Sequence, residues 1–104
     1  MVEDAPAHSA VAISIKGPVT LGEVARLRDD LADALARSGG LRLDLSGSGP
    51  WDLAGTQLLL AVAASCERVG GTLCLTSAPA VFLSMVERSG LLDRFSPLFD
   101  AKSG

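Results

Sequence analysis

The chain has 104 residues, a hydrophobic fraction of 48%, a charged fraction of 20% and a formal net charge of -3. This length suits one domain with a single modest core and excludes two domains of ordinary size, while the apolar fraction excludes an intrinsically disordered chain. Lys and Arg form no cluster. We therefore expect no nucleic-acid binding, because that role needs clustered positive charge to neutralise phosphates.

Residues 1–10 are polar and small, contain a proline and form an expected N-terminal tail. They carry early acidic residues and no apolar segment, so they do not resemble a signal peptide. The longest apolar run, Leu58 to Ala64, is far shorter than the roughly 20 residues that cross a bilayer. We expect a cytoplasmic protein with no insertion into a membrane.

Alternating apolar residues predict a first strand over Val11–Lys16, which Gly17-Pro18 breaks or bends. A helix is predicted over Leu21–Arg37, because apolar side chains recur there at spacings of three and four. Thr20 is its predicted N-cap, and Glu23 completes a capping box three residues later.

The next unit begins with a predicted strand over Leu41–Leu45. Ser46 to Pro50 is rich in Gly and Ser and predicts a flexible loop. Asp52 is the predicted N-cap of a second helix over Leu53–Val69. That helix is apolar on most sides, so it is buried on more than one face or offers an apolar patch to another molecule.

A third strand is predicted over Thr72–Thr76, followed by a helix that starts at Ser77–Pro79 and ends near Ser89. Leu91 to Phe99 predicts a short docking helix and an edge segment, before a C-terminal tail over residues 100–104. The regular alternation of strands and helices favours an α/β fold with parallel strands joined by right-handed crossovers.

Few residues are suited to catalysis or metal binding. His8 is the only histidine and lies in the expected tail, which argues against a Ser–His or Cys–His nucleophile. Cys66 and Cys74 lie in apolar runs without zinc-ligand spacing, and nothing else indicates a disulfide-forming compartment. We expect no metal, no cofactor and no enzymatic activity.

The loop between the second strand and second helix has a composition that phosphate-binding loops share. Ser46-Gly47-Ser48-Gly49 precedes a helix, but no lysine opens that helix as the Walker pattern requires. Asp44 and Asp52 flank the loop, and nothing adds a third acidic ligand for magnesium. Helix capping is the simpler role for Asp52.

The stretch from Asp52 to Thr56 is the most unusual in the chain. Ala54 and Gly55 leave the backbone of the first helical turn nearly bare, which suits close approach by another protein or by an anion. Gly55 also permits tight packing of the helix on the sheet. Both interpretations of Gly55 stay open at this point.

Short motifs follow one another in a fixed order along the chain. They are the strand end Leu43-Asp44-Leu45-Ser46-Gly47, the helix start Asp52-Leu53-Ala54-Gly55, the link Gly70-Gly71-Thr72-Leu73 and the helix end Val86-Glu87-Arg88-Ser89-Gly90-Leu91. In order and spacing they resemble the STAS domain, a family named for sulfate transporters and anti-sigma factor antagonists. The resemblance implies one STAS domain over residues 11–99, with a mixed, mainly parallel sheet and helices packed on one side.

The resemblance also implies regulation by protein binding. In anti-sigma factor antagonists, a partner kinase phosphorylates the second serine of an Asp-Ser-Ser-Gly motif, and the unphosphorylated form binds that kinase. Here Ala54 stands at the position of that serine and has no hydroxyl, so the usual switch is absent. Thr56, Ser46 and Ser48 are the nearby hydroxyls, and hydrogen bonding within loop and helix is their more ordinary role.

Two kinds of partner fit this resemblance. One is a kinase-like ATPase of bacterial sigma-factor or chemotaxis control. The other is the ATPase of a bacterial phospholipid ABC transporter, whose STAS subunits often carry Asp-Thr-Ala-Gly in the motif; Ala54 suits this group and Leu53 departs from it. In either case we expect the partner-binding segment to be Asp52, Leu53, Ala54, Gly55 and Thr56, with the adjoining helix face.

Overall fold

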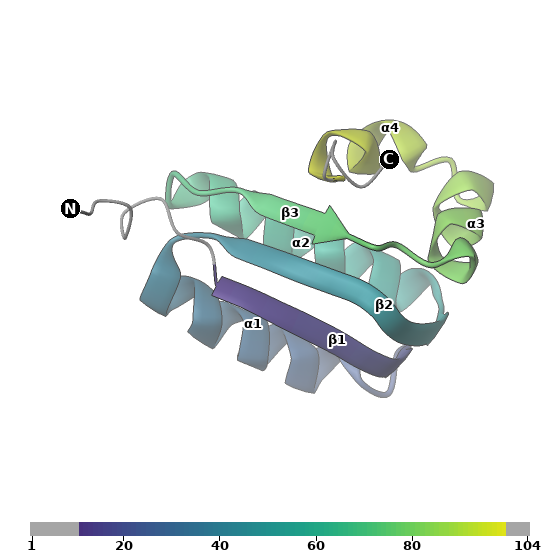
Figure 1. Cartoon of the computed structure of the whole chain (residues 1–104), viewed down its shortest axis with the longest axis horizontal. Coiled ribbons are helices and arrows are strands. Elements are labelled where there is room, and N and C mark those ends of the chain that lie inside the picture. The colour runs from purple at the N-terminus through teal and green to yellow at the C-terminus, as the bar shows by residue number, and fades with distance from the viewer. Residues whose placement is uncertain (1–10, 100–104) are drawn as a thin grey trace.

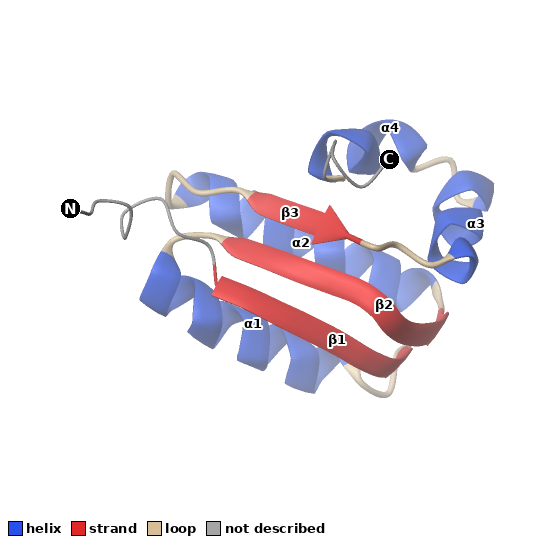
Figure 2. Cartoon of the chain, in the orientation of Figure 1, coloured by secondary structure: helices blue, strands red, loops and turns tan. Residues whose placement is uncertain are grey.

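The computed structural model describes residues 11–99. The expected tails 1–10 and 100–104, and with them His8, lie outside the described residues. The predicted alternation is confirmed: the elements are β1 (Val11–Val19), α1 (Val24–Ser38), β2 (Leu41–Trp51), α2 (Leu53–Arg68), β3 (Leu73–Thr76), α3 (Ala80–Arg88), α4 (Leu92–Phe95) and the 3-10 turn η2 (Ser96–Leu98) (Figure 2).

The three strands form one sheet in the order β1-β2-β3, and both pairings are parallel. α1 and α2 lie side by side behind this sheet (Figure 1). The expected mainly parallel sheet with helices packed on one face is thereby confirmed. α3 lies at the carboxyl end of the strands and contacts β2, while Phe99 forms a parallel bridge to Leu75 at the free edge of β3.

The core lies between the sheet and the two helices. Leu41, Leu43 and Leu45 of the central strand are fully buried, whereas Arg42 between them is exposed on the opposite face. This alternation follows from the period of two along a strand. Each such leucine contributes about 2 kcal/mol to folding by leaving water. β2 is therefore the rigid base from which α2 starts.

The predicted loop over residues 46–50 is wrong, because these residues continue β2 up to Trp51. Two register shifts against β1 let the longer strand stay paired, as β-bulges do. The Ser48 hydroxyl fastens this stretch: it donates to the Leu45 carbonyl at 2.6 Å and accepts from the indole N–H of Trp51 at 2.9 Å. Long-range pairing here overrides the local turn composition.

The first helix starts later than predicted, at Val24 rather than Leu21. Half of the capping box is present, because the Thr20 N–H donates to the Glu23 carboxylate at 3.1 Å. The Thr20 hydroxyl also donates to that carboxylate, so it does not cap a backbone N–H. Residues 21–23 consequently form a turn between β1 and α1.

Aromatic side chains hold α3 and α4 against the end of β2. Phe82 is fully buried, with its ring centroid 4.6 Å from that of Trp51 and 5.4 Å from that of Phe95. Tilted and edge-on arrangements of this kind are favourable for aromatic pairs. Trp51, which ends β2 directly before Asp52, is thus part of the core.

Candidate functional site

Asp52 caps α2, as predicted, and it also binds a second segment. Its Oδ1 atom accepts a hydrogen bond from the Gly55 N–H at 3.1 Å, which satisfies one free amide of the first turn. Its Oδ2 atom accepts from the Leu21 N–H at 3.0 Å, in the turn between β1 and α1. One carboxylate therefore links the start of α2 to the loop that follows β1.

Gly55 is buried where α2 meets the end of β1. A Cβ atom at this position would lie 2.1 Å from the Val19 carbonyl oxygen and 2.9 Å from the Val19 Cγ1 atom. The Asp52 N–H donates to the same carbonyl at 3.4 Å. Of the two interpretations that the sequence leaves open for Gly55, tight packing on the sheet has direct geometric support.

Thr56 is fully buried, and its hydroxyl donates to the Asp52 carbonyl at 2.8 Å. Ser48 is also buried and uses its hydroxyl within β2. Ser46, by contrast, is exposed. Phosphorylation of Thr56 or Ser48 would require the site to open, so neither hydroxyl is presented to a kinase in this structure.

The five predicted site residues therefore divide into two groups. Gly55 and Thr56 face inward and set the position of the helix, and Asp52 is half-buried with both carboxylate oxygens engaged. Leu53 is 47% exposed and Ala54 is partly exposed. Direct contact with another molecule thus falls on Leu53 and Ala54, and their use by a partner stays a prediction.

Sequence reasoning missed Leu21, which is 73% exposed. Its backbone N–H binds the carboxylate of Asp52, the residue directly before Leu53, although the two lie 31 positions apart in the chain. The sequence signal is misleading here, because it predicts Leu21 as the first residue of a helix, whereas the structure leaves it in the turn before α1. The structure adds Leu21 to the exposed apolar residues around the start of α2.

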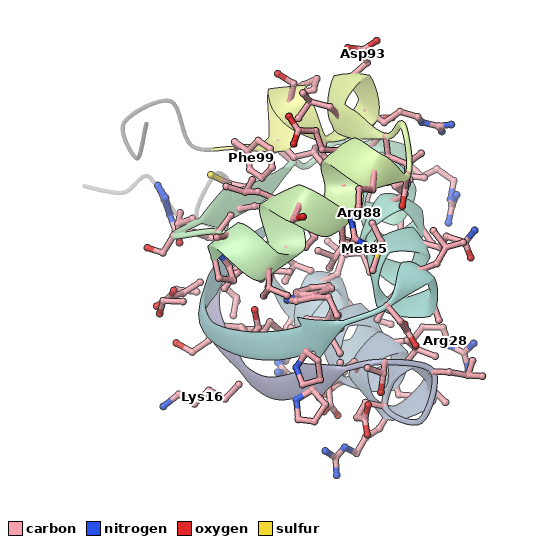
Figure 3. All side chains as sticks on the ribbon, turned by 90° about the vertical axis from the view of Figure 1, so that its right-hand side faces the viewer. Lys16, Arg28, Met85, Arg88, Asp93 and Phe99 are labelled. Atoms are coloured by element: carbon pink, nitrogen blue, oxygen red, sulfur yellow. The ribbon has the colours of Figure 1, made fainter. Side chains whose placement is uncertain are left out.

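A second apolar area lies on α3, which faces the viewer in Figure 3 with Met85 and Arg88 labelled on it. Val81 is 46% exposed and Leu83 is 40% exposed. An open hollow of about 430 Å³ lies between α3 and the start of α4 and is lined by Ala80, Leu83, Ser84, Glu87 and Leu92. Exposed apolar side chains consequently occur at two helix starts on the same end of the molecule.

The remaining reactive groups are dispersed. Cys66 is buried and Cys74 is partly exposed, both as free thiols, and burial raises the pKa of the Cys66 thiol. Asp44 accepts from the Ser46 N–H at 2.9 Å, and this hydrogen bond is the main cause of its lowered pKa. Among residues 11–99, no three His, Cys, Asp or Glu side chains gather in a way that would hold a metal ion.

No helix in the described part of the chain is both long enough and apolar enough to span a bilayer.

Comparison with known proteins agrees with the resemblance seen in the motifs. The family described as "Mlab, STAS domain" matches residues 3–98. A sulfate transporter family protein from Wolinella succinogenes has a TM-score of 0.69 at 21% identity, over 85% of this chain and 73% of that chain. The STAS domain of a SulP transporter from Vibrio cholerae has a TM-score of 0.61 at 15% identity, over 85% and 70% of the two chains.

Murine Solute Carrier 26 family member A9, an anion transporter solved in the inward-facing state, has a TM-score of 0.69 at 21% identity. The match covers 82% of this chain and 15% of the transporter chain. Among curated protein sequences, no match to this chain was found. Because the family match spans nearly the whole sequence and the solved structures share the fold, the chain belongs to the STAS family.

Proposed function

We propose that this STAS domain is a non-catalytic cytoplasmic module that regulates a protein partner by binding it at the start of α2. One observation carries the proposal. The apolar side chains of Leu53 and Leu21 are exposed, at 47% and 73%, on a backbone that Asp52 and Gly55 hold in place. Apolar side chains presented on a preorganised backbone bind with little loss of conformational entropy.

The surface is proposed to stay competent for binding at all times. Ala54 stands where related antagonists carry the phosphorylated serine, and alanine accepts no phosphate. The buried hydroxyls of Thr56 and Ser48 are engaged in hydrogen bonds inside the domain. Control of the complex would then come from the partner or from the amount of protein, not from a charge added at this helix start.

The first candidate partner is a kinase-like ATPase of bacterial sigma-factor or chemotaxis control. The second is the ATPase of a bacterial phospholipid ABC transporter, and Ala54 favours it because STAS subunits of that group often carry alanine at this position. Leu53 is the departure from that group's motif. Both candidates are proposed to bind the same surface, so one capture experiment tests that surface and identifies which partner binds it.

The experiment compares affinity capture from native lysate by the wild-type chain and by Ala54→Glu, with mass spectrometry of the captured proteins. A carboxylate at residue 54 puts charge into the apolar contact, so recovery of the partner should fall about tenfold or more. Circular dichroism checks that the variant is folded. Equal recovery by a folded Ala54→Glu variant would refute binding at this surface.

The identity of the captured protein separates the two candidates. A histidine-kinase-like ATPase or a chemotaxis kinase supports the signalling role. An ABC ATPase together with its permease makes the chain a transporter subunit and removes the signalling role.

A further inference from the structure

We infer that Asp52 is a positioning residue of the proposed docking surface: it holds Leu21, in the turn over residues 21–23, against α2, so that Leu21 and Leu53 act as one apolar contact. The inference rests on the proposed function, and it assigns Asp52 a role beyond that of a helix cap. It also assigns Leu21, far from the family motif in sequence, to the surface.

The two oxygens of the Asp52 carboxylate serve different segments. Oδ1 binds the Gly55 N–H at 3.1 Å, inside α2, and Oδ2 binds the Leu21 N–H at 3.0 Å, outside it. A helix cap needs only the first of these bonds. The second bond therefore has a purpose that capping does not explain.

Val19, just before the turn, is already held beside the start of α2, since it pairs with Trp51 and its carbonyl accepts from the Asp52 N–H at 3.4 Å. The turn itself extends beyond that anchor. Its other hydrogen bonds are local, from the Thr20 N–H and hydroxyl to the Glu23 carboxylate and from the Glu23 N–H to the Thr20 carbonyl at 2.8 Å. These bonds fix the shape of the turn, but none of them joins it to α2. Among the hydrogen bonds described for this turn, the bond from Leu21 to Asp52 is the one that reaches the start of α2, so it fixes how Leu21 is held there.

The engaged carboxylate also limits what Asp52 can do directly. Both oxygens already accept backbone N–H groups, so Asp52 acts through the segments it holds and is not the contact itself. Leu21, Gly22, Leu53 and Ala54 carry no charge, whichever segment they come from. This composition matches one occupant, an apolar ridge on the ATPase partner, because a charged ridge would lose its hydration without gaining a counter-charge.

The test uses Asp52→Ser, because serine caps a helix as well as aspartate does but its short side chain does not reach Leu21. Amide hydrogen exchange is measured by NMR on the free protein. The Leu21 amide should exchange about tenfold faster in the variant, since it loses one hydrogen bond. The Gly55 amide should stay within about threefold of wild type, since the cap is retained. Equal Leu21 exchange in both proteins, or an unprotected Leu21 amide in wild type, would overturn the inference.

A double-mutant cycle adds a readout that helix capping alone would not move. Its probe is the purified ATPase captured by the wild-type chain. Asp52→Ser should weaken binding about tenfold in the wild-type background and less than about twofold when Leu21→Ala is already present, since residues that act through one contact are not additive. Additive effects of the two substitutions would contradict the positioning role.

The two proposals fail separately in these experiments. If the wild-type chain captures no ATPase, the proposed function is wrong, while Leu21 exchange still decides whether Asp52 holds the turn. If an ATPase binds but Asp52→Ser and Leu21→Ala act independently, docking stands and the positioning role is wrong.

Discussion

The starts of α2 and α3 are alike in exposure and different in what fixes them. Each follows the carboxyl end of a strand, and each presents an apolar residue that is about half exposed, Leu53 at 47% and Val81 at 46%. Asp52 caps α2 through its side chain, whereas Pro79 precedes α3 and makes no such bond. Exposure alone therefore does not distinguish the two sites.

The fixing interactions do distinguish them. The start of α2 is held by directional hydrogen bonds and by the close approach of Gly55 to the Val19 carbonyl. The start of α3 is held by Phe82, packed against Trp51 and Phe95. Hydrogen bonds fix orientation, while apolar packing is mainly non-directional. α2 is therefore built to present its first residues in one geometry, and α3 is built to close the core.

Phe82→Ala should loosen the packing that holds α3 and should cause the largest loss of stability. Removing a fully buried aromatic ring leaves a cavity that costs about 3–5 kcal/mol of unfolding free energy. Urea denaturation followed by circular dichroism measures the loss. Leu83→Ala, on the same helix at 40% exposure, is the matched control and should cost less than about 1 kcal/mol. A larger loss for Leu83→Ala than for Phe82→Ala would contradict the assignment of Phe82 to the core.

Gly55→Ala should disturb the start of α2 and cause a somewhat smaller loss of stability. The added Cβ would lie 2.1 Å from the Val19 carbonyl oxygen, so the backbone has to shift. Such overpacking costs about 3 kcal/mol, even though alanine is the better helix former. Thermal unfolding gives the comparison with Gly22→Ala, where a Cβ meets nothing within 4 Å and the change should stay within about 0.5 kcal/mol. Equal stability of the two variants would mean that Gly55 is not packed as described.

The local parts of this arrangement were predictable from the sequence. The strand and helix periods reveal the alternating fold, and the Asp52 cap depends only on an amide three residues later. The residues of the family motif likewise lie close together in the sequence, which is why the motif could be recognised without the structure.

The long-range parts were not predictable. The bond between Leu21 and Asp52 joins residues 31 positions apart, and no local pattern encodes it. Whether Gly55 serves packing or access depends on its contact with Val19, which lies in β1 and is distant in the sequence. The continuation of β2 through residues 46–50 depends on pairing with β1, which overrides the tendency of Gly and Pro to form turns.

The smallest expected effect concerns Asp44, a hydrogen-bonded carboxylate in β2 that belongs to neither helix start. The Ser46 N–H, followed in importance by the Ser46 side chain, lowers the pKa of Asp44 below its ordinary value of 3.8. A carboxyl with a lowered pKa in the folded state contributes stability above its unfolded pKa and loses it as the pH falls through the folded pKa. The contribution is therefore complete at neutral pH and lost in acid below 3.8.

An NMR titration of the Asp44 side-chain carboxyl carbon measures this shift directly. The midpoint should lie below 3.8, and Asp44→Asn should weaken the pH dependence of unfolding in that acid range. A midpoint at or above 3.8 would show that the hydrogen bond to Ser46 does not persist in solution.

Docking at the start of α2 is tested most directly by the affinity of the captured ATPase for Leu53→Glu and for Val81→Glu, measured by calorimetry on folded proteins. The two residues are almost equally exposed, and a glutamate in the first turn of either helix is compatible with the helix dipole, so stability should be little changed. We predict that Leu53→Glu weakens binding about a hundredfold, while Val81→Glu stays within about threefold of wild type. Strong loss of binding with Val81→Glu and normal binding by Leu53→Glu would place the docking surface on α3 and contradict docking at the start of α2.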